Sequence, residues 1–418
     1  MYQLSNYISE FKTISKLVLV SLKTGNLLIL SDQAYIEEYQ KIKHQNRLSS
    51  INTQLEAALY SSGFITLTPE DLSSHIGVIK NKMKKALKII ILPTEKCNFR
   101  CAYCYESFKH GKMSSTYINA IKNFLKKKLS TGNFTELHLN WFGGEPLLEV
   151  QVIKEIQSYA LELCLLYNIN ISSNITTNGY LLDISLFQEL LDLKINIFQI
   201  TIDGENHDQK RVLISGKPTY QKIISNLKEI QKSSEKYQII LRNNILTDQF
   251  DESFYDELKS FISNDSRFEV LIKPVGNWGG NNNVEKLNLL STREIITQNM
   301  LRHFSLLIDR KIEIYNFTEL LPMHSICYAA YPDSYVFRSN GDICKCTVYF
   351  DLPENTIGKI ISENEIYINE KLANLWVTDE LEKKCFACKH MLACFNKSCP
   401  AKRIKSGISY AKTCSPFF

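Results

Sequence analysis

Six short apolar runs, each separated from the next by a stretch with helical periodicity, constrain the fold more than any other feature. Alternating strands and helices predict a parallel α/β architecture, either curved into a partial barrel or left as an open sheet. In both forms, functional groups gather at the carboxyl ends of the strands. The expected strands are residues 87–91, 136–142, 169–176, 196–203, 237–245 and 268–275. The expected helices are residues 118–129, 152–167, 185–193, 220–231 and 254–262.

Conspicuous motifs follow the first four of these runs. A cysteine triplet comes after the first run, GGEPLL after the second, TTNG after the third and TIDG after the fourth. Parallel strands bring their carboxyl ends to one rim. We therefore expect the four motifs to form a single site.

The triplet consists of Cys97, Cys101 and Cys104 in the segment TEKCNFRCAYCYE. Disulfides need pairs of cysteines and an oxidising compartment, and three clustered thiols fit neither condition. A structural zinc site needs four ligands, and no fourth lies nearby in the sequence. A catalytic [4Fe–4S] cluster can keep one iron open for substrate. The spacing alone leaves cluster and zinc as alternatives.

Composition narrows the class of protein. The 418 residues are 44% hydrophobic and 22% charged, which is typical of a globular chain with two or three domains. A net charge of +5 is too small to indicate a nucleic-acid partner. The sequence shows neither a secretory signal nor an apolar stretch long enough for a membrane span, so we expect a cytoplasmic protein with no membrane partner. Twelve cysteines in that compartment indicate metal binding.

About eighty residues precede the first expected strand. Residues 18–30 predict a β-hairpin with a TGN turn, and residues 35–44 and 51–63 predict helices. Two interpretations stay open. The segment is either a winged-helix-like module whose hairpin edge captures an extended peptide by strand addition, or an extension that packs on the sheet.

The triplet, with Tyr103 before its third cysteine and GGEP at the end of the second run, resembles the radical SAM superfamily. In that family three cysteines hold a [4Fe–4S] cluster whose open iron binds S-adenosylmethionine. One electron from the cluster cleaves the cofactor, and the 5′-deoxyadenosyl radical takes a hydrogen atom from the substrate. The resemblance implies a partial (β/α)6 TIM-like barrel.

The resemblance also implies contacts with the cofactor. Arg211 would meet the cofactor carboxylate, for which a guanidinium is well suited, although a surface ion pair is an alternative. Asp203 is expected to be a turn residue before glycine. The residues implied in cofactor binding are Tyr103, Gly143, Gly144, Glu145, Thr201 and Arg211.

The remaining cysteines resemble the SPASM domain, a seven-cysteine module that binds two auxiliary [4Fe–4S] clusters, so that three clusters are implied in all. One residue more than the usual spacing precedes Cys399. Cys344 is either a fourth ligand of the nearer cluster or none, whereas Cys164 lies in an apolar run and is expected to be buried. A zinc ribbon on Cys385 and Cys388 is the alternative. The implied ligands are Cys385, Cys388, Cys394 and Cys414 for the distal cluster, and Cys327, Cys346 and Cys399 for the nearer one.

The whole arrangement resembles maturases of ribosomally made peptides. This implies a precursor peptide with a leader as substrate, a crosslink (thioether or C–C) or related modification as product, and an external electron donor similar to flavodoxin or ferredoxin. The predicted domains are a leader-recognition-like module (1–82), a radical SAM barrel (86–276), a connecting linker and helix (277–324) and a SPASM domain (325–418).

Three alternatives remain. An anaerobic sulfatase-maturating enzyme, which forms formylglycine, would begin nearer its first cysteine motif and would carry an aspartate base where this chain has Thr347. A radical SAM enzyme acting on a small molecule and a non-catalytic peptide binder holding zinc are the others. No catalytic base is assigned; Tyr103, Asn243 and Asn244 are candidates for the pocket.

Overall fold

A computed structural model describes the chain from residue 1 to residue 406 with short gaps. Outside the description are residues 14, 68–72, 205, 247–251, 277–286, 288, 290–291, 378–384, 387, 396–398 and 407–418. Cys414, a predicted cluster ligand, lies outside the described residues. No helix in the described part is long and apolar enough to cross a membrane.

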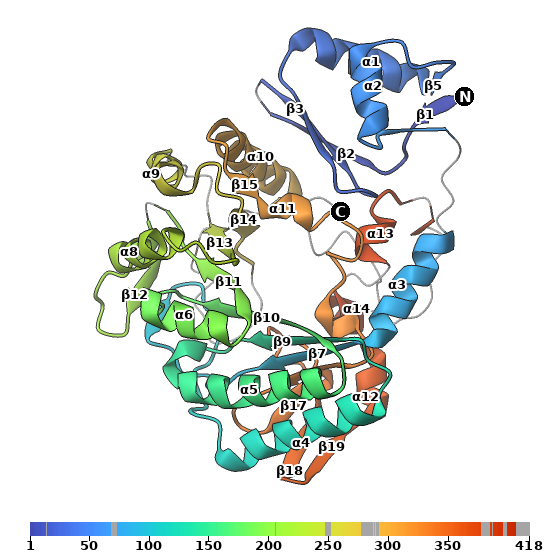
Figure 1. The fold of residues 1–418 in the computed structure, drawn as a ribbon. Coiled ribbons are helices and arrows are strands. Elements are labelled where there is room, and N and C mark those ends of the chain that lie inside the picture. The colour runs from blue at the N-terminus through green and yellow to red at the C-terminus, as the bar shows by residue number, and fades with distance from the viewer. Residues whose placement is uncertain are drawn as a thin grey trace.

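All six predicted strands are present and form the centre of one sheet of eleven strands (Figure 1). Each pairs with the next in parallel, which confirms the α/β prediction. The sheet curves but does not close, because β15 (Glu313–Ile314) and β19 (Glu365–Ile368) are its two edges. The six strands are β7 (Ala86–Ile91), β9 (Glu136–Trp141), β10 (Asn170–Thr177), β11 (Ile195–Thr201), β13 (Gln238–Ile245) and β14 (Phe268–Pro274).

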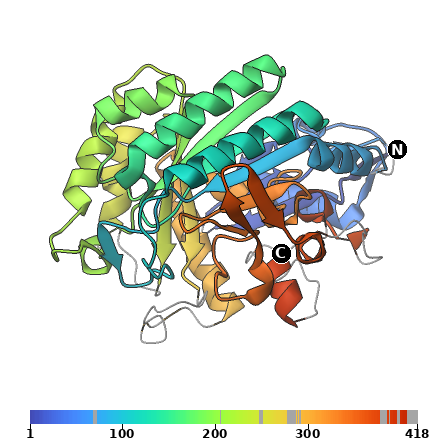
Figure 2. The same cartoon turned by 90° about the horizontal axis from the view of Figure 1, so that it is seen from below.

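The predicted helices cover one face of this sheet (Figures 1 and 2). Two of them begin at side-chain caps, where Ser114 and Asp183 accept hydrogen bonds from backbone N–H groups of the first turn. The helices are α4 (Ser115–Thr131), α5 (Val150–Leu166), α6 (Ile184–Asp192), α8 (Tyr220–Gln231) and α9 (Ser253–Ile262). Cys164 is buried in α5 among apolar neighbours, as predicted.

Alternation along the strands separates an apolar face from a more polar one. Leu87, Ile89 and Ile91 of β7 share a core with the buried residues of α4 and α5. Lys88 lies between them in sequence and places its Nζ 4.2 Å from the ring centroid of Tyr331, in the C-terminal part. The inner face of the curved sheet therefore faces the C-terminal segments.

The N-terminal residues form a unit with its own small core, while the other face of its sheet, with Phe11 and Val18, belongs to the main core of the molecule. The predicted hairpin is β3 (Leu17–Ser21) with β4 (Leu27–Leu30), and β2 (Ile8–Lys12) pairs with the other side of β3. A second small sheet contains β1 (Tyr2–Leu4), β5 (Arg47–Leu48) and β6 (Ile65–Thr66). The helices are α1 (Gln33–Gln45), α2 (Gln54–Ser61) and α3 (Ser73–Lys85), and α3 leads directly into β7.

The C-terminal part extends the central sheet, which the sequence did not predict. After α10 (Arg293–Asp309) and α11 (Tyr315–Thr318), β16 (Ser334–Phe337) pairs in parallel with β7. From there β17 (Asp342–Cys344), β18 (Thr356–Ser362) and β19 continue the sheet antiparallel. The remaining helices are α12 (Glu370–Leu375), α13 (Met391–Cys394) and α14 (Pro400–Ser406).

Candidate active site

The cysteine triplet lies on the loop after β7 and is held by a two-stranded sheet. Within this loop β8 (Phe99–Cys101) pairs antiparallel with β12 (Arg211–Leu213), and the register places Arg211 opposite Cys101. The backbone N–H of Ala102 also donates to the carbonyl of Lys210 at 2.8 Å. This pairing brings a guanidinium more than one hundred residues away beside the thiols.

The GGE motif after β9 packs directly against the triplet loop. Gly143 has a φ of +132°, and a Cβ there would lie 2.3 Å from the carbonyl oxygen of Thr94. A Cβ at Gly144 would lie 2.4 Å from the carbonyl oxygen of Lys96. The two glycines therefore permit close approach of the loop that carries Cys97. They also line the cavity described below.

Replacing Gly144 by alanine should consequently displace the cysteine loop. We expect a loss of about 3 kcal/mol or more in the free energy of unfolding, since the clash is with backbone atoms that cannot rotate away. Chemical denaturation would measure it, together with iron bound after reconstitution. Gly111→Ala is the matched control, because a Cβ at Gly111 meets nothing within 4 Å. Equal stability of the two variants would contradict the prediction.

Glu145 joins two of the strand-end loops. Its fully buried carboxylate accepts hydrogen bonds from Thr177 Oγ1 and the backbone N–H of Asn178, both at 2.7 Å, and from the N–H of Leu147 at 3.0 Å. Burial raises the pKa of this carboxyl, and the hydrogen bonds act in the opposite direction. Its predicted contact with the cofactor stays a prediction; the structure shows a carboxylate that fixes the GGE and TTNG loops together.

A polar network forms one wall of the site. Tyr103 donates its hydroxyl proton to Asp203 and accepts from Arg211 at 2.9 Å and from Asn244 Nδ2 at 3.1 Å. Asp203 also accepts from the backbone N–H of Asn244 at 3.1 Å. Asp203 precedes Gly204, whose φ is +73°, so the predicted turn is present. Its carboxylate also joins Tyr103 to Asn244.

Arg211 is buried, so the surface ion pair considered for it is wrong. Its Nε has no hydrogen-bond partner among the residues that the structure describes. Burial alone lowers the pKa of Arg211, but the nearby Cys101 and Asp203 groups raise it above its usual value, so the group stays charged. An unpartnered charged donor that lines a cavity suits an anionic ligand group such as a carboxylate.

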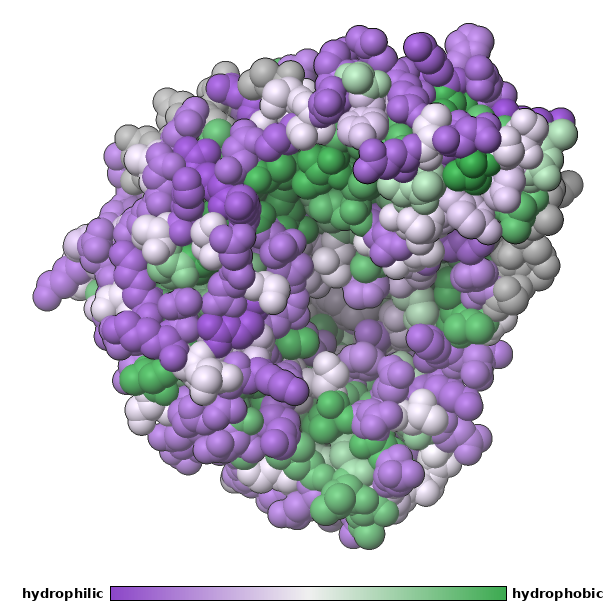
Figure 3. Space-filling view, turned by 45° about the horizontal axis from the view of Figure 1, so that its top comes forward, coloured by the Kyte–Doolittle hydropathy of each residue, from purple (hydrophilic) through white to green (hydrophobic). Residues whose placement is uncertain are grey.

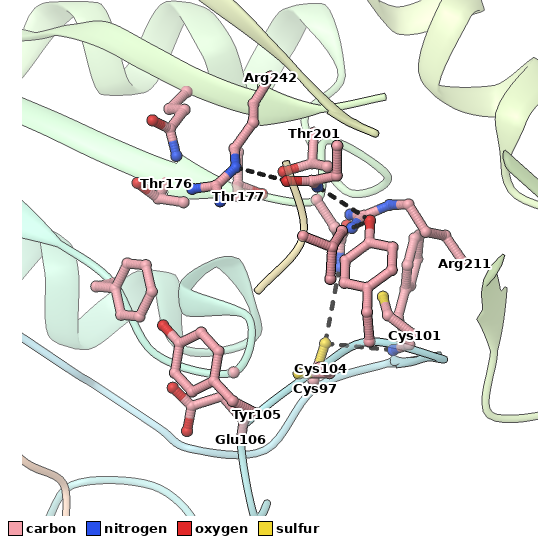
Figure 4. A pocket seen from close by; sticks show the side chains of 18 of the residues that line it. Cys97, Cys101, Cys104, Tyr105, Glu106, Thr176, Thr177, Thr201, Arg211 and Arg242 are labelled. Atoms are coloured by element: carbon pink, nitrogen blue, oxygen red, sulfur yellow. Dashed lines mark hydrogen bonds between the residues drawn. The ribbon is translucent and has the colours of Figure 1, made fainter. Parts of the chain in front are cut away.

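These elements enclose a cavity of about 160 Å³ at the carboxyl ends of the strands (Figure 4). Eight of the residues predicted to bind the cluster or the cofactor line it together: Cys97, Cys101, Tyr103, Cys104, Gly143, Gly144, Thr201 and Arg211. Asn244, a candidate for the pocket, lines it as well, whereas Asn243 is buried outside the lining. Thr176, Thr177 and Asn178 of the predicted TTNG motif line it too, and lining residues that the sequence did not indicate include Tyr105, Glu106, Gln199 and Arg242. Only Tyr105 and Glu106 carried a usable signal, namely their position directly after the triplet.

Glu106 lies beside a buried ion pair between two residues that are far apart in the sequence. Arg338, at the end of β16, donates from Nε and Nη2 to both carboxylate oxygens of Glu95 at 2.9 and 3.0 Å. Oε1 of Glu106 has no hydrogen-bond partner within the described residues. Burial and the Glu95 charge raise the pKa of Glu106 to about 8.

The three thiols fit an iron–sulfur cluster better than a single ion. Burial raises the pKa values of Cys97 and Cys104 to about 12, so metal binding would displace their protons. Within the described ranges, no three His, Cys, Asp or Glu side chains are gathered tightly enough to hold one metal ion. A four-iron cube is held differently, because each thiolate binds a different iron.

The C-terminal cysteines fall into groups. Cys327, Cys346 and Cys399 influence one another electrostatically, and burial is the main reason that the pKa of Cys327 is raised to about 12. Cys344 packs instead in a separate apolar cluster with Ile90, its Sγ 3.8 Å from Thr356 Oγ1. Cys385 and Cys388 share a turn that leads to Cys394 at the end of α13. Ligand roles for all of these cysteines remain predictions.

Comparison with known proteins places this site in a family. Residues 91–257 match the model of the radical SAM superfamily. An uncharacterized protein of Methanocaldococcus jannaschii is 25% identical over 74% of this chain and 98% of that protein. The serine-type anaerobic sulfatase-maturating enzyme of Bacteroides thetaiotaomicron is 22% identical over 76% of this chain and 84% of the enzyme.

Two solved structures are similar in fold. The structure of anSMEcpe with bound AdoMet and the Cp18Cys peptide has a TM-score of 0.57 at 18% identity, covering 80% of this chain and 96% of that one. Streptococcus suis SuiB bound to its precursor peptide SuiA has a TM-score of 0.51 at 15% identity, covering 100% of this chain and 98% of SuiB.

Residues 91–257 therefore form a radical SAM domain, and the protein is an enzyme. Its sequence is similar to that of a sulfatase-maturating enzyme, and its fold is similar to those of anSMEcpe and SuiB. The family implies a [4Fe–4S] cluster and S-adenosylmethionine as cofactors, as the sequence motifs predicted.

Proposed function

We propose that this enzyme is a maturase that modifies a ribosomally made precursor peptide. The observation that carries the proposal is the cavity itself, where three thiols and Arg211 converge at the carboxyl ends of the strands; the Nε of Arg211 has no hydrogen-bond partner among the described residues. The likeness to SuiB, which was solved with a precursor peptide and matches this chain over its whole length, supports a peptide as substrate.

Different residues of the cavity would bind the cluster and S-adenosylmethionine. Cys97, Cys101 and Cys104 would bind three irons of a [4Fe–4S] cluster, and Arg211 would bind the carboxylate of S-adenosylmethionine. When bound, the cluster and S-adenosylmethionine supply the 5′-deoxyadenosyl radical that takes a hydrogen atom from the substrate. Gly143, Gly144 and Thr201 would contact the cofactor, and Tyr103 holds Arg211 in place. The walls orient the target carbon and exclude water.

The C-terminal part would bind two auxiliary clusters as a SPASM domain. Cys327, Cys346 and Cys399 would hold the nearer one. The separate packing of Cys344 favours an open iron there over a fourth thiolate. The ligands proposed for the distal cluster are Cys385, Cys388, Cys394 and Cys414. These clusters would accept the electron left when a substrate radical closes a bond, and a flavodoxin- or ferredoxin-like protein would supply electrons.

The N-terminal unit offers an edge for the peptide leader. β4 pairs with β3 on one side, and no other described strand pairs with its outer side. Leu27 and Ile29 of this strand are 43% and 38% exposed. An added strand would use the open backbone groups and cover both side chains. Figure 3 shows a face of the molecule that is hollowed near its centre, with hydrophobic residues above and below the hollow.

A sulfatase-maturating enzyme is the second candidate, because a relative of that name matches 76% of this chain. Where such an enzyme is expected to have an aspartate base, this chain has Thr347. The hydroxyl and the N–H of Thr347 are each 2.8 Å from the Tyr328 hydroxyl. Thiol or alcohol oxidation would then need another proton acceptor. This difference favours the peptide-crosslinking function.

Anaerobic reconstitution tests the proposed function. We expect about twelve irons per chain and, on addition of dithionite and S-adenosylmethionine, formation of 5′-deoxyadenosine. The Cys327, Cys346 and Cys399 triple alanine variant should retain about eight irons. Zinc in place of iron, or a chain that never cleaves the cofactor, would return the protein to the class of peptide-binding modules.

A further inference from the structure

His207 is a buried residue near the cavity but is not one of the residues that line it. It begins the short helix α7 (His207–Lys210) and is fully buried. Both ring nitrogens are bonded: Nδ1 lies 3.2 Å from the backbone N of Asp203, and Nε2 lies 3.0 Å from Thr219 Oγ1. The ring therefore bridges the end of β11 and the start of α8.

The partners of His207 determine where its protons are. The N–H of Asp203 can only donate, so Nδ1 must accept and carry no proton. Thr219 Oγ1 donates its proton to the carbonyl of Arg211 at 2.6 Å, so it must accept the proton of Nε2. The imidazole is neutral, with its proton on Nε2. Burial, together with the positive charge of Arg211, lowers the pKa of His207 to about 2, in agreement with this assignment.

These hydrogen bonds form a relay that runs from Asp203 N–H through His207 and Thr219 to Arg211 C=O, and both of its ends are residues of the site. Asp203 holds Tyr103 and Asn244 through its carboxylate, and Arg211 reaches the same Tyr103 hydroxyl with Nη1. The relay from Asp203 N–H through His207 and Thr219 to Arg211 C=O therefore sets the backbone positions from which these side chains extend. The β8–β12 pairing, the Tyr103 contact, the Phe99 ring and the hydrogen bond from its own N–H to the His207 carbonyl also locate Arg211, and the last of these comes from the same histidine.

We infer that His207 is a positioning residue which, through Thr219, holds Arg211 where its free Nε binds the carboxylate of S-adenosylmethionine. The inference rests on the cofactor contact proposed for Arg211. It adds two residues, His207 and Thr219, that do not line the cavity. Thr219 makes no side-chain cap to α8, so this relay is the structural use shown for its hydroxyl.

The test compares two probes on reconstituted enzyme: S-adenosylhomocysteine, which keeps the carboxylate, and 5′-methylthioadenosine, which lacks it. His207→Leu should lower the affinity for S-adenosylhomocysteine by about tenfold or more, as expected when a charged hydrogen bond is misplaced. The affinity for 5′-methylthioadenosine should not change. Thr219→Val cuts the relay at its middle and should give the same pattern. His207→Gln keeps a donor for Thr219 and should recover most of the affinity.

His303→Leu is the matched control. His303 is also buried, with a pKa lowered by burial to about 3, but its partners Tyr255 and Asn299 lie outside the cavity lining. It should lose stability and bind both probes as the wild type does. Equal weakening of both probes by His207→Leu, unchanged binding in Thr219→Val, or no recovery in His207→Gln would overturn the inference. Wild-type enzyme that holds iron but binds neither probe would instead refute the proposed function, and the inference with it.

Discussion

Replacing Cys97, Cys101 and Cys104 together by alanine is expected to remove about four of about twelve irons and to abolish 5′-deoxyadenosine formation. The three thiols line one cavity with Arg211, and each would bind a different iron of one cluster. Iron analysis and Mössbauer spectra of the anaerobically reconstituted variant would measure the loss. The remaining iron should have the spectrum of intact [4Fe–4S] clusters.

Cys164→Ala is the control for this variant. Cys164 is buried in the core between α5 and the sheet, and the proposed ligand sets do not include it. It should keep the wild-type iron content and the wild-type rate of cofactor cleavage, with only a small loss of stability. A triple variant that retains all of its iron, or a Cys164 variant that loses four, would refute the assignment of the triplet.

Arg338→Met is expected to lower the free energy of unfolding by about 3–5 kcal/mol, because it leaves the Glu95 carboxylate buried without a partner. Glu95 is fully buried, and both of its carboxylate oxygens accept hydrogen bonds from Arg338. Since Glu95 precedes Cys97 by two residues, the variant should also bind less iron at the triplet. Denaturant unfolding and iron analysis would measure the two effects.

Two further variants isolate the cause. The double change Glu95→Met with Arg338→Met removes both charges and should recover much of the lost stability. Arg310→Met breaks ion pairs with Asp256 and Glu252, whose side chains are more than 60% exposed, and should cost about 1 kcal/mol or less. If the double variant were as unstable as Arg338→Met, the buried charge would not explain the loss.

Local patterns explain why much of the fold was predictable. The six strands and five helices are encoded by periodicity over fewer than twenty residues each, and all of them are present. The cysteine triplet and GGE are likewise local, and their meeting at one rim follows from parallel topology alone. Buried Cys164 was recognisable from its apolar neighbours.

Features that depend on distant pairing were not predictable. Arg338 and Glu95 are 243 positions apart, and neither has a neighbour in sequence that indicates the other. The register that places Arg211 opposite Cys101 depends on two strands of only three residues each. The cofactor contact of Glu145 stays a prediction, but the sequence did not indicate that its three hydrogen bonds bind two loops of the protein to each other.

The place of β16 beside β7 sets an order of events during synthesis. β7 acquires its partner β9 early, but its other edge stays open until Phe337 has left the ribosome. An open central strand is prone to pair with other chains, so nascent barrels are exposed to aggregation during this interval. During the same interval Glu95, two residues before Cys97, also lacks its partner Arg338.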